Sequence, residues 1–150
     1  MREFQINLAH LFRKDLNRLS DEISKYPDDE ILGKTVKGIT NSSANLTLHL
    51  IGNLNHFIGH QLGGSSYVRD REAEFGRKDI TKEELLEKLA DCQEVVADSL
   101  QKINDEQLNT MHDPGFITGE TMTVRQFLMH LYGHLNYHLG QINYHRRILS

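Results

Sequence analysis

The chain has 150 residues, which lies within the usual range of ~100–200 residues for one domain. Its net charge of −4 and pI of about 6.1, with no long run of Lys or Arg, exclude the basic footprint expected of a protein that binds nucleic acid or an anionic membrane. A single cysteine, Cys92, excludes an internal disulfide, and residues 1–10 contain no apolar signal-peptide core. We therefore expect one domain, residues 1–150, in the cytoplasm.

Apolar residues recur at helical spacing in four segments, and no segment shows sustained strand-like alternation. The first segment, residues 2–25, keeps most of its charges away from its apolar side and ends before Pro27. The second, residues 42–62, stops at a Gly-Gly pair and lies in a stretch, residues 38–68, that contains no Asp, Glu, Lys or Arg. Its asparagines and histidines argue against a membrane span of ~20 apolar residues and favour a helix buried among other helices.

The third segment, residues 81–103, opens with a capping-box pattern from Thr81 to Glu84. The fourth runs from residue 124 to the C-terminus and follows a second capping-box pattern, Thr123 to Gln126. Connections of roughly 15–19 residues are longer than the ~2–8 typical of bundles, so they permit a crossover and can cover a site. The pattern predicts an all-α fold, a four-helix bundle with long connecting loops.

Seven of the nine histidines lie in the two segments that carry the fewest charges, and within each segment they share one helical face. They are His49, His56 and His60 in the second segment, and His130, His134, His138 and His145 in the fourth. His134 and His138 lie one helical turn apart, so their rings can converge on one ion. A third ligand must come from a neighbouring helix, and His49, near the middle of the second segment, is the leading candidate. Three imidazoles that leave one position open are typical of a catalytic metal site.

Nitrogen ligands suit zinc, nickel, iron or copper and disfavour magnesium or calcium. A lone histidine on such a face is more often a hydrogen-bonded core or surface residue than a ligand. Neither central helix supplies an acid as a partner, and metal coordination would satisfy several histidines at once. The chain lacks the Glu-x-x-His, His-Glu-x-x-His and Cys-x-x-Cys-His patterns of di-iron, zincin and c-type haem proteins, whereas haem ligation by two histidines stays open.

His130 and His134 form a second pair with the same spacing, so His130 is a rival ligand. We expect His56, His60 and His145 to lie at the surface or at an interface, and His10 and His112 to be solvated.

The run His134-Leu-Asn-Tyr-His138-Leu-Gly-Gln141 resembles the C-terminal signature of the DinB/YfiT-like superfamily, and Leu48-His49-Leu-Ile-Gly-Asn53 resembles its second-helix histidine. The resemblance implies an up-down-down-up bundle and a homodimer, with His49, His134 and His138 as metal ligands. It also favours His138 over the rival His130, because Gly140 and Gln141 follow in register. We expect one divalent transition metal per chain, zinc or nickel first, with iron or manganese as alternatives.

Members of this superfamily use the metal to activate a low-molecular-weight thiol for transfer to an electrophile, or are presumed hydrolases. The resemblance thus implies an S-transferase of bacillithiol, mycothiol or glutathione type, or a hydrolase that activates water. A metal-binding or interaction module without turnover is the alternative. Cys92 lies on an apolar stripe, where a packing role is expected.

Five further residues are candidates around the metal. His130, Asn53 and Tyr137 are candidates for positions behind the ligands or facing the substrate, and Tyr137 also suits a dimer interface. Arg69 and Arg71 have the chemistry to hold substrate carboxylates, although a solvated loop is the commoner role of such a segment.

Overall fold

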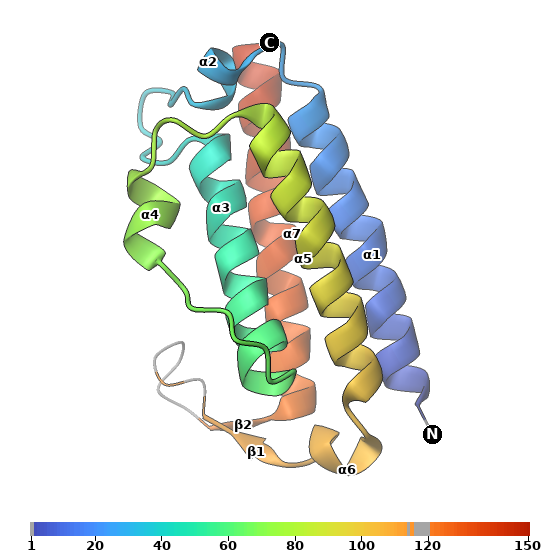
Figure 1. Ribbon diagram of the computed structural model, residues 1–150. Helices are drawn as coiled ribbons and strands as arrows, with labels where there is room; N and C mark the ends of the chain where they lie inside the picture. The colour runs from blue at the N-terminus through green and yellow to red at the C-terminus, as the bar shows by residue number, and fades with distance from the viewer. Residues whose placement is uncertain (1, 114, 116–120) are drawn as a thin grey trace.

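The computed structural model describes residues 2–113, 115 and 121–150. Four long helices form the body of the molecule: α1 (Glu3–Ser24), α3 (Ser43–Leu54), α5 (Lys82–Lys102) and α7 (Val124–Leu149). In Figure 1, α1 runs upward, α3 and α5 run downward, and α7 runs upward again. The all-α bundle with up-down-down-up order is therefore confirmed.

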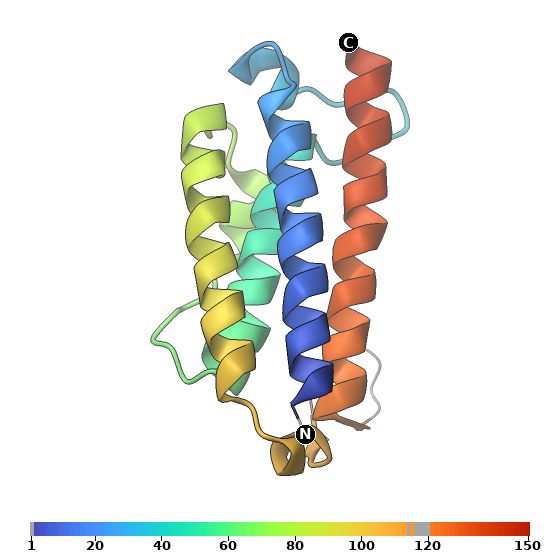
Figure 2. The ribbon, with the colours of Figure 1, turned by 90° about the vertical axis from the view of Figure 1, so that its right-hand side faces the viewer.

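The helices form a ring in which α1 contacts α5 and α7, and α3 contacts the same two helices. Figure 2 shows α1 flanked by α5 and α7. Leucines from all four helices fill the centre, among them Leu16, Leu50, Leu89 and Leu131, each almost fully buried. Consequently α3 and α7 lie side by side and antiparallel, which brings their histidine-bearing faces together.

Every residue of α3 is buried, which explains why this helix contains no charged side chain. Its N-cap is Ser42, whose hydroxyl accepts a hydrogen bond from the backbone N–H of Asn45 at 3.1 Å. After Leu54 the chain continues as a π-helix, η1 (Asn55–Leu62), with wider turns than an α-helix. The predicted single helix over 42–62 is thus two helices of different pitch.

The long connections contain short elements: α2 (Asp29–Leu32), α4 (Arg71–Gly76), α6 (Asp105–Leu108), and an antiparallel pair β1 (Met111–His112) and β2 (Met122–Thr123). Helix α4 packs against α3 from outside the ring (Figure 1). We expected a long connection to cover a site. Helix α4, in the connection between η1 and α5, lies beside the helix that carries His49.

The two predicted capping boxes differ in outcome. At α7 the box is complete, since Thr123 and Gln126 each accept a backbone hydrogen bond from the other. At α5, Thr81 accepts from the backbone N–H of Glu84, but the Glu84 carboxylate binds Arg77 through contacts of 2.6 and 2.8 Å. A strong cation therefore draws Glu84 away from the helix end.

No helix among the described residues combines the length and apolarity that a bilayer crossing requires.

Candidate functional site

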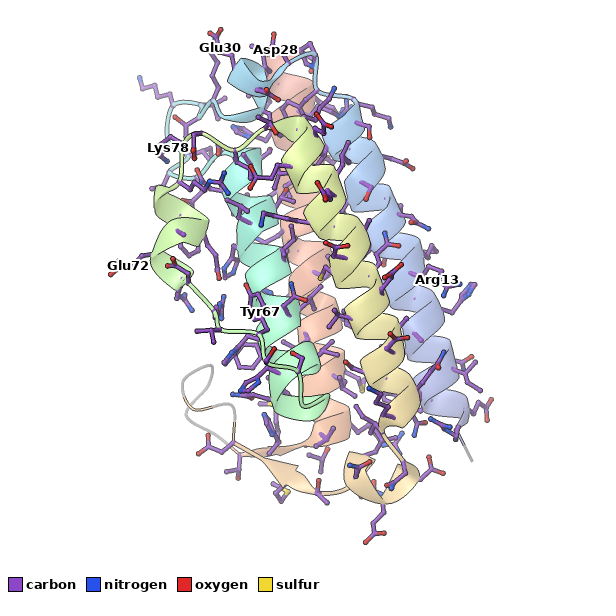
Figure 3. The ribbon with its side chains drawn as sticks, viewed as in Figure 1. Arg13, Asp28, Glu30, Tyr67, Glu72 and Lys78 are labelled. Carbon is purple, nitrogen blue, oxygen red and sulfur yellow. The ribbon has the colours of Figure 1, made fainter. Side chains whose placement is uncertain are left out.

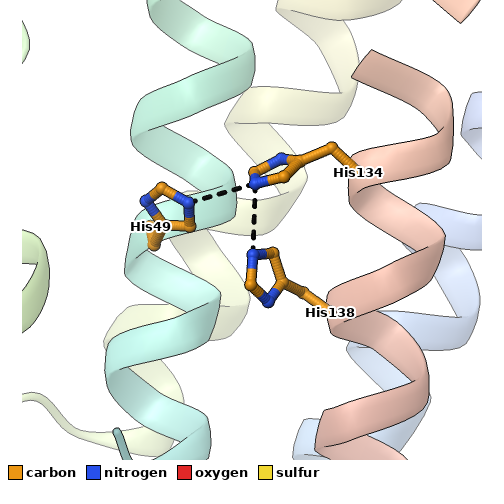
Figure 4. A group of neighbouring side chains, drawn as sticks. All are labelled: His49, His134 and His138. Carbon is orange, nitrogen blue, oxygen red and sulfur yellow. Dashed lines mark hydrogen bonds between the residues drawn. The ribbon is translucent and has the colours of Figure 1, made fainter. Parts of the chain in front are cut away.

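The rings of His49, His134 and His138 meet between α3 and α7 (Figure 4). Nε2 of His134 lies 3.2 Å from Nε2 of His49 and 3.1 Å from Nε2 of His138. One ligand-capable atom from each residue falls within 4.8 Å of the others, and His49 is buried while the other two are half-buried. Among the described residues this is the one histidine, cysteine or carboxylate group of three or more that could hold a metal ion.

Hydrogen bonds on the far side of two rings set which nitrogen faces the centre. Nδ1 of His49 lies 3.0 Å from Oε1 of Glu74, and Nδ1 of His138 lies 2.7 Å from Oε1 of Gln141. Both oxygens are acceptors, so each Nδ1 carries the proton and each Nε2 presents a lone pair to the centre. Nδ1 of His134 is buried and has no hydrogen-bond partner among the described residues.

Glu74 belongs to a buried ion pair behind His49. Its carboxylate accepts from Nε of Arg69 at 2.8 Å and from Nη2 at 2.9 Å, and the two side chains are only 5% and 9% exposed. Arg69 Nη2 also lies 3.4 Å from Nδ1 of His49. A bare Nδ1 would place its lone pair 3.0 Å from a lone pair of the carboxylate, so the Nδ1–H form of His49 fits the Glu74 contact. The 3.4 Å approach of Arg69 Nη2 to the same nitrogen is then a close contact between two donors and not a hydrogen bond.

Burial and charge determine the ionisation of this group. Burial alone would raise the pKa of the Glu74 carboxyl, but hydrogen bonds from His49 and Arg69 outweigh it and hold the pKa below its ordinary value. Burial lowers the pKa of His134 to about 4, and the neighbouring His138 and His49 act in the same direction. Burial also lowers the pKa of His138, against the hydrogen bond to Gln141. His134 and His138 are therefore neutral at neutral pH, the form that can donate a lone pair to a metal.

Sequence reasoning missed Glu74 altogether and treated its segment as a solvated loop. That interpretation is wrong for Glu74, which is buried, and for Arg69, whose side chain is only 9% exposed. It fits Glu72, which points away from the bundle (Figure 3). The available signal was Gly52, one turn after His49, where a Cβ would lie 2.0 Å from Oε2 of Glu74. A small residue in an otherwise bulky buried helix marks a close neighbour.

The other candidates lie outside the cluster. His130 is exposed, and its ring stacks 6.4 Å from that of Phe127. Asn53 is buried, and its Oδ1 has no hydrogen-bond partner among the described residues. Tyr137 is 66% exposed, with its ring 5.3 Å from that of His138.

Arg71 is exposed, and its guanidinium lies 5.9 Å from the centroid of the Phe75 ring. Arg69 is engaged by Glu74, so two of its donor nitrogens already have a carboxylate. Binding of substrate carboxylates by Arg69 and Arg71 stays a prediction.

The remaining histidines depart from expectation at two positions. His145 was expected at the surface or an interface, but it is buried, with Nδ1 2.9 Å from Oγ of Ser43. His112 was expected to be solvated, but it is half-buried in β1 and stacks on the ring of Phe127 at 4.8 Å. His10 and His60 are exposed, as expected, and His56 is half-buried.

The family described as "Protein of unknown function (DUF1572)" matches residues 2–150. The chain belongs to this family. Its fold is similar to that of a DinB-like protein from Bacillus cereus ATCC 10987, with a TM-score of 0.72 and 17% sequence identity over 93% of this chain and 89% of that chain. The resemblance to the DinB-like fold is thus confirmed. Comparison with curated proteins finds no match.

Proposed function

We propose that His49, His134 and His138 hold one divalent transition metal, zinc or nickel first, and that the protein uses it as an enzyme acting on a low-molecular-weight thiol or on water. The observation that carries the proposal is the convergence of three Nε2 atoms, two of them with tautomers set by Glu74 and Gln141. The Nδ1–H tautomers of His49 and His138 aim two lone pairs at Nε2 of His134, which carries either a proton shared between them or, as we propose, a lone pair that joins them on a cation.

Two of the three nitrogen–nitrogen separations match those expected around such an ion. Ligand nitrogens at about 2.0–2.1 Å from a tetrahedral zinc lie about 3.3–3.4 Å from one another. The two short separations at His134, 3.2 and 3.1 Å, are close to that value. The ion would also engage the Nε2 lone pair of His134, which would place the ring proton on its buried Nδ1.

The chain's own groups would prepare the site in three ways. Glu74, held by Arg69, keeps Nε2 of His49 aimed at the centre. Gln141 does the same for His138. His134 and His138 are half-buried, so neither ring is sealed from solvent.

A transition metal at this position would supply Lewis acidity, which lowers the pKa of a thiol or water that reaches it. With a haloaromatic acceptor, a sulfur–carbon bond would form, the carbon–halogen bond would break, halide would leave with its bonding pair, and the thiol proton would pass to solvent. Burial raises the pKa of Cys92 to about 12, so the protein's own cysteine is not the thiol used.

The first experiment measures metal content of the purified chain by elemental analysis. We expect about one transition metal per chain, and loss of it in His49→Ala and His138→Ala. The matched control is His130→Ala on the same helix, which should keep the metal. If His130→Ala loses the metal and His138→Ala keeps it, the ligand assignment is wrong and the rival pair replaces it.

The second experiment measures turnover. The metal-loaded protein should consume bacillithiol, mycothiol or glutathione in the presence of 1-chloro-2,4-dinitrobenzene, and His49→Ala should not. Retained metal without consumption of any of these thiols would move the assignment to hydrolysis or to the metal-binding module without turnover.

We also propose that two copies associate, as the family resemblance implies. Support comes from Met129 and Tyr137, which are 58% and 66% exposed on α7. Sedimentation should give twice the chain mass, and Tyr137→Glu should reduce it to one chain.

A further inference from the structure

A cavity of about 460 Å³ lies near the histidine cluster, toward the N-terminal end of α3 and the C-terminal end of α7. It lies between the connection that follows α2 and the last turns of α7. Apolar side chains form much of its wall, namely Val36, Ile39, Leu46, Tyr144 and Ile148. The described residues that line it include no Asp, Glu, Lys or Arg. Its volume falls within the ~300–1,000 Å³ typical of small-molecule sites.

The cavity lies about one helical turn from the cluster along both α3 and α7. Leu46 comes three residues before His49 on α3, and Gln141 comes three residues after His138 on α7. Because the helices are antiparallel, both steps lead in the same direction, by about 4.5 Å at ~1.5 Å per residue. The Gln141 side chain connects the cavity with the cluster, since it lines the cavity and accepts a hydrogen bond from His138.

The wall also carries polar side chains, namely Thr40, Asn41, Gln141 and His145. The phenol of Tyr26 donates to Oγ of Ser43, so the Ser43 hydroxyl is left to donate to Nδ1 of His145. The proton of neutral His145 is therefore on Nε2, which is buried and has no hydrogen-bond partner among the described residues. This Nε2 has almost no accessible surface, so the acceptor atom of a ligand would meet the Thr40 hydroxyl or the Asn41 amide on the wall instead.

We propose that this cavity binds the uncharged body of the electrophilic co-substrate, an aromatic or aliphatic molecule with a hydrogen-bond acceptor, an assignment that rests on the function proposed above. The charge-free wall argues against the thiol partner, because glutathione and its counterparts carry carboxylates that would be desolvated there without a cation. A molecule seated in the cavity would place its reactive end one helical turn away, at the cluster.

The test uses 1,3-dinitrobenzene, which has acceptor oxygens and no leaving group, titrated into the full-length isotope-labelled protein and followed by NMR. We expect saturable shifts at backbone amides of residues 36–46 and 141–148. Ile39→Trp, at a half-exposed wall position, should fill the cavity and weaken binding by at least about tenfold. Ile6→Trp, at an exposed position on α1, is the matched control and should bind as the parent does.

Metal-free His49→Ala should bind the probe as well, because the ring of His49 is not part of the cavity wall. Binding of the probe without thiol turnover would therefore contradict thiol transfer and leave the cavity as a site for an uncharged ligand. Absence of saturable shifts, or equal binding by Ile39→Trp, would overturn the assignment. Loss of binding as protein concentration rises would also overturn it, because a second copy on Tyr144 and Ile148 would then be the occupant.

Discussion

Gly52 faces the Glu74 carboxylate so closely that no side chain fits between them: a Cβ at position 52 would lie 2.0 Å from Oε2 of Glu74. The carboxylate is the far end of a side chain, so it can move away without disturbing the helix. Movement would, however, remove the hydrogen bond to His49. The absence of a side chain at position 52 is thus a condition for the arrangement behind the cluster.

Gly52→Ala should accordingly damage the site more than the fold. We expect zinc affinity to fall by about tenfold or more, as for other losses of a carboxylate behind a metal-binding histidine. Isothermal titration of zinc into metal-free protein measures it. Gly133→Ala is the control, since a Cβ there meets no atom within 4 Å and α7 gains helix propensity of up to about 1 kcal/mol. Equal zinc affinity in both variants would contradict the role of Gly52.

Glu74→Gln tests the charge of the same group while keeping its shape. The amide oxygen can still accept from His49, but the negative charge that strengthens the ligand is lost and Arg69 is left without its anion. We expect zinc affinity to fall about 10–100-fold. Glu72→Gln on the outward face of α4 should leave it unchanged (Figure 3). Zinc binding by Glu74→Gln as tight as in the parent chain would show that the carboxylate does not support His49.

The metal-free protein should lose stability as pH falls from about 6.5 toward 4. His134 has a folded pKa of about 4 against an ordinary 6.5, so the unfolded chain takes up the proton first. Its contribution is complete above pH 6.5, and up to about 3 kcal/mol is lost by pH 4. Urea denaturation across this range measures it. His134→Gln should flatten the profile and His10→Gln, at an exposed position, should not; an equal slope in all three proteins would contradict the assignment.

Cys92 should behave as a packing residue. Its thiol is fully buried and its pKa is raised to about 12, so a thiol-reactive dye should label it only after unfolding. Cys92→Ala should lower the free energy of unfolding by about 1 kcal/mol and leave zinc affinity unchanged. Rapid labelling of the native protein, or loss of zinc in the variant, would assign the thiol a role at the site.

The helices and the meeting of the histidines could be predicted from the sequence because both depend on local periodicity. The spacing of His134 and His138 sets their shared face, and a charge-free helix around His49 requires a partner surface. The resemblance to the DinB-like fold supplied the order of the helices.

Glu74 could not be placed in the same way, because its contact with His49 depends on where a connection of irregular shape folds back. The π-helix could not be predicted from periodicity either. Its wider turns rotate His56 and His60 away from the direction that an α-helix extending from His49 would give them. His145 is buried by partners on other elements, Ser43 and through it Tyr26, which its own helix does not reveal.

The cluster joins two parts of the chain that are far apart in sequence, since His49 and His134 are separated by 85 residues. An ion held by both would act as a reversible cross-link, and closing so long a loop restricts the unfolded chain far more than the folded one. Metal occupancy and global stability would then rise and fall together. A melting temperature that climbs with metal concentration would therefore report the occupancy of the site directly.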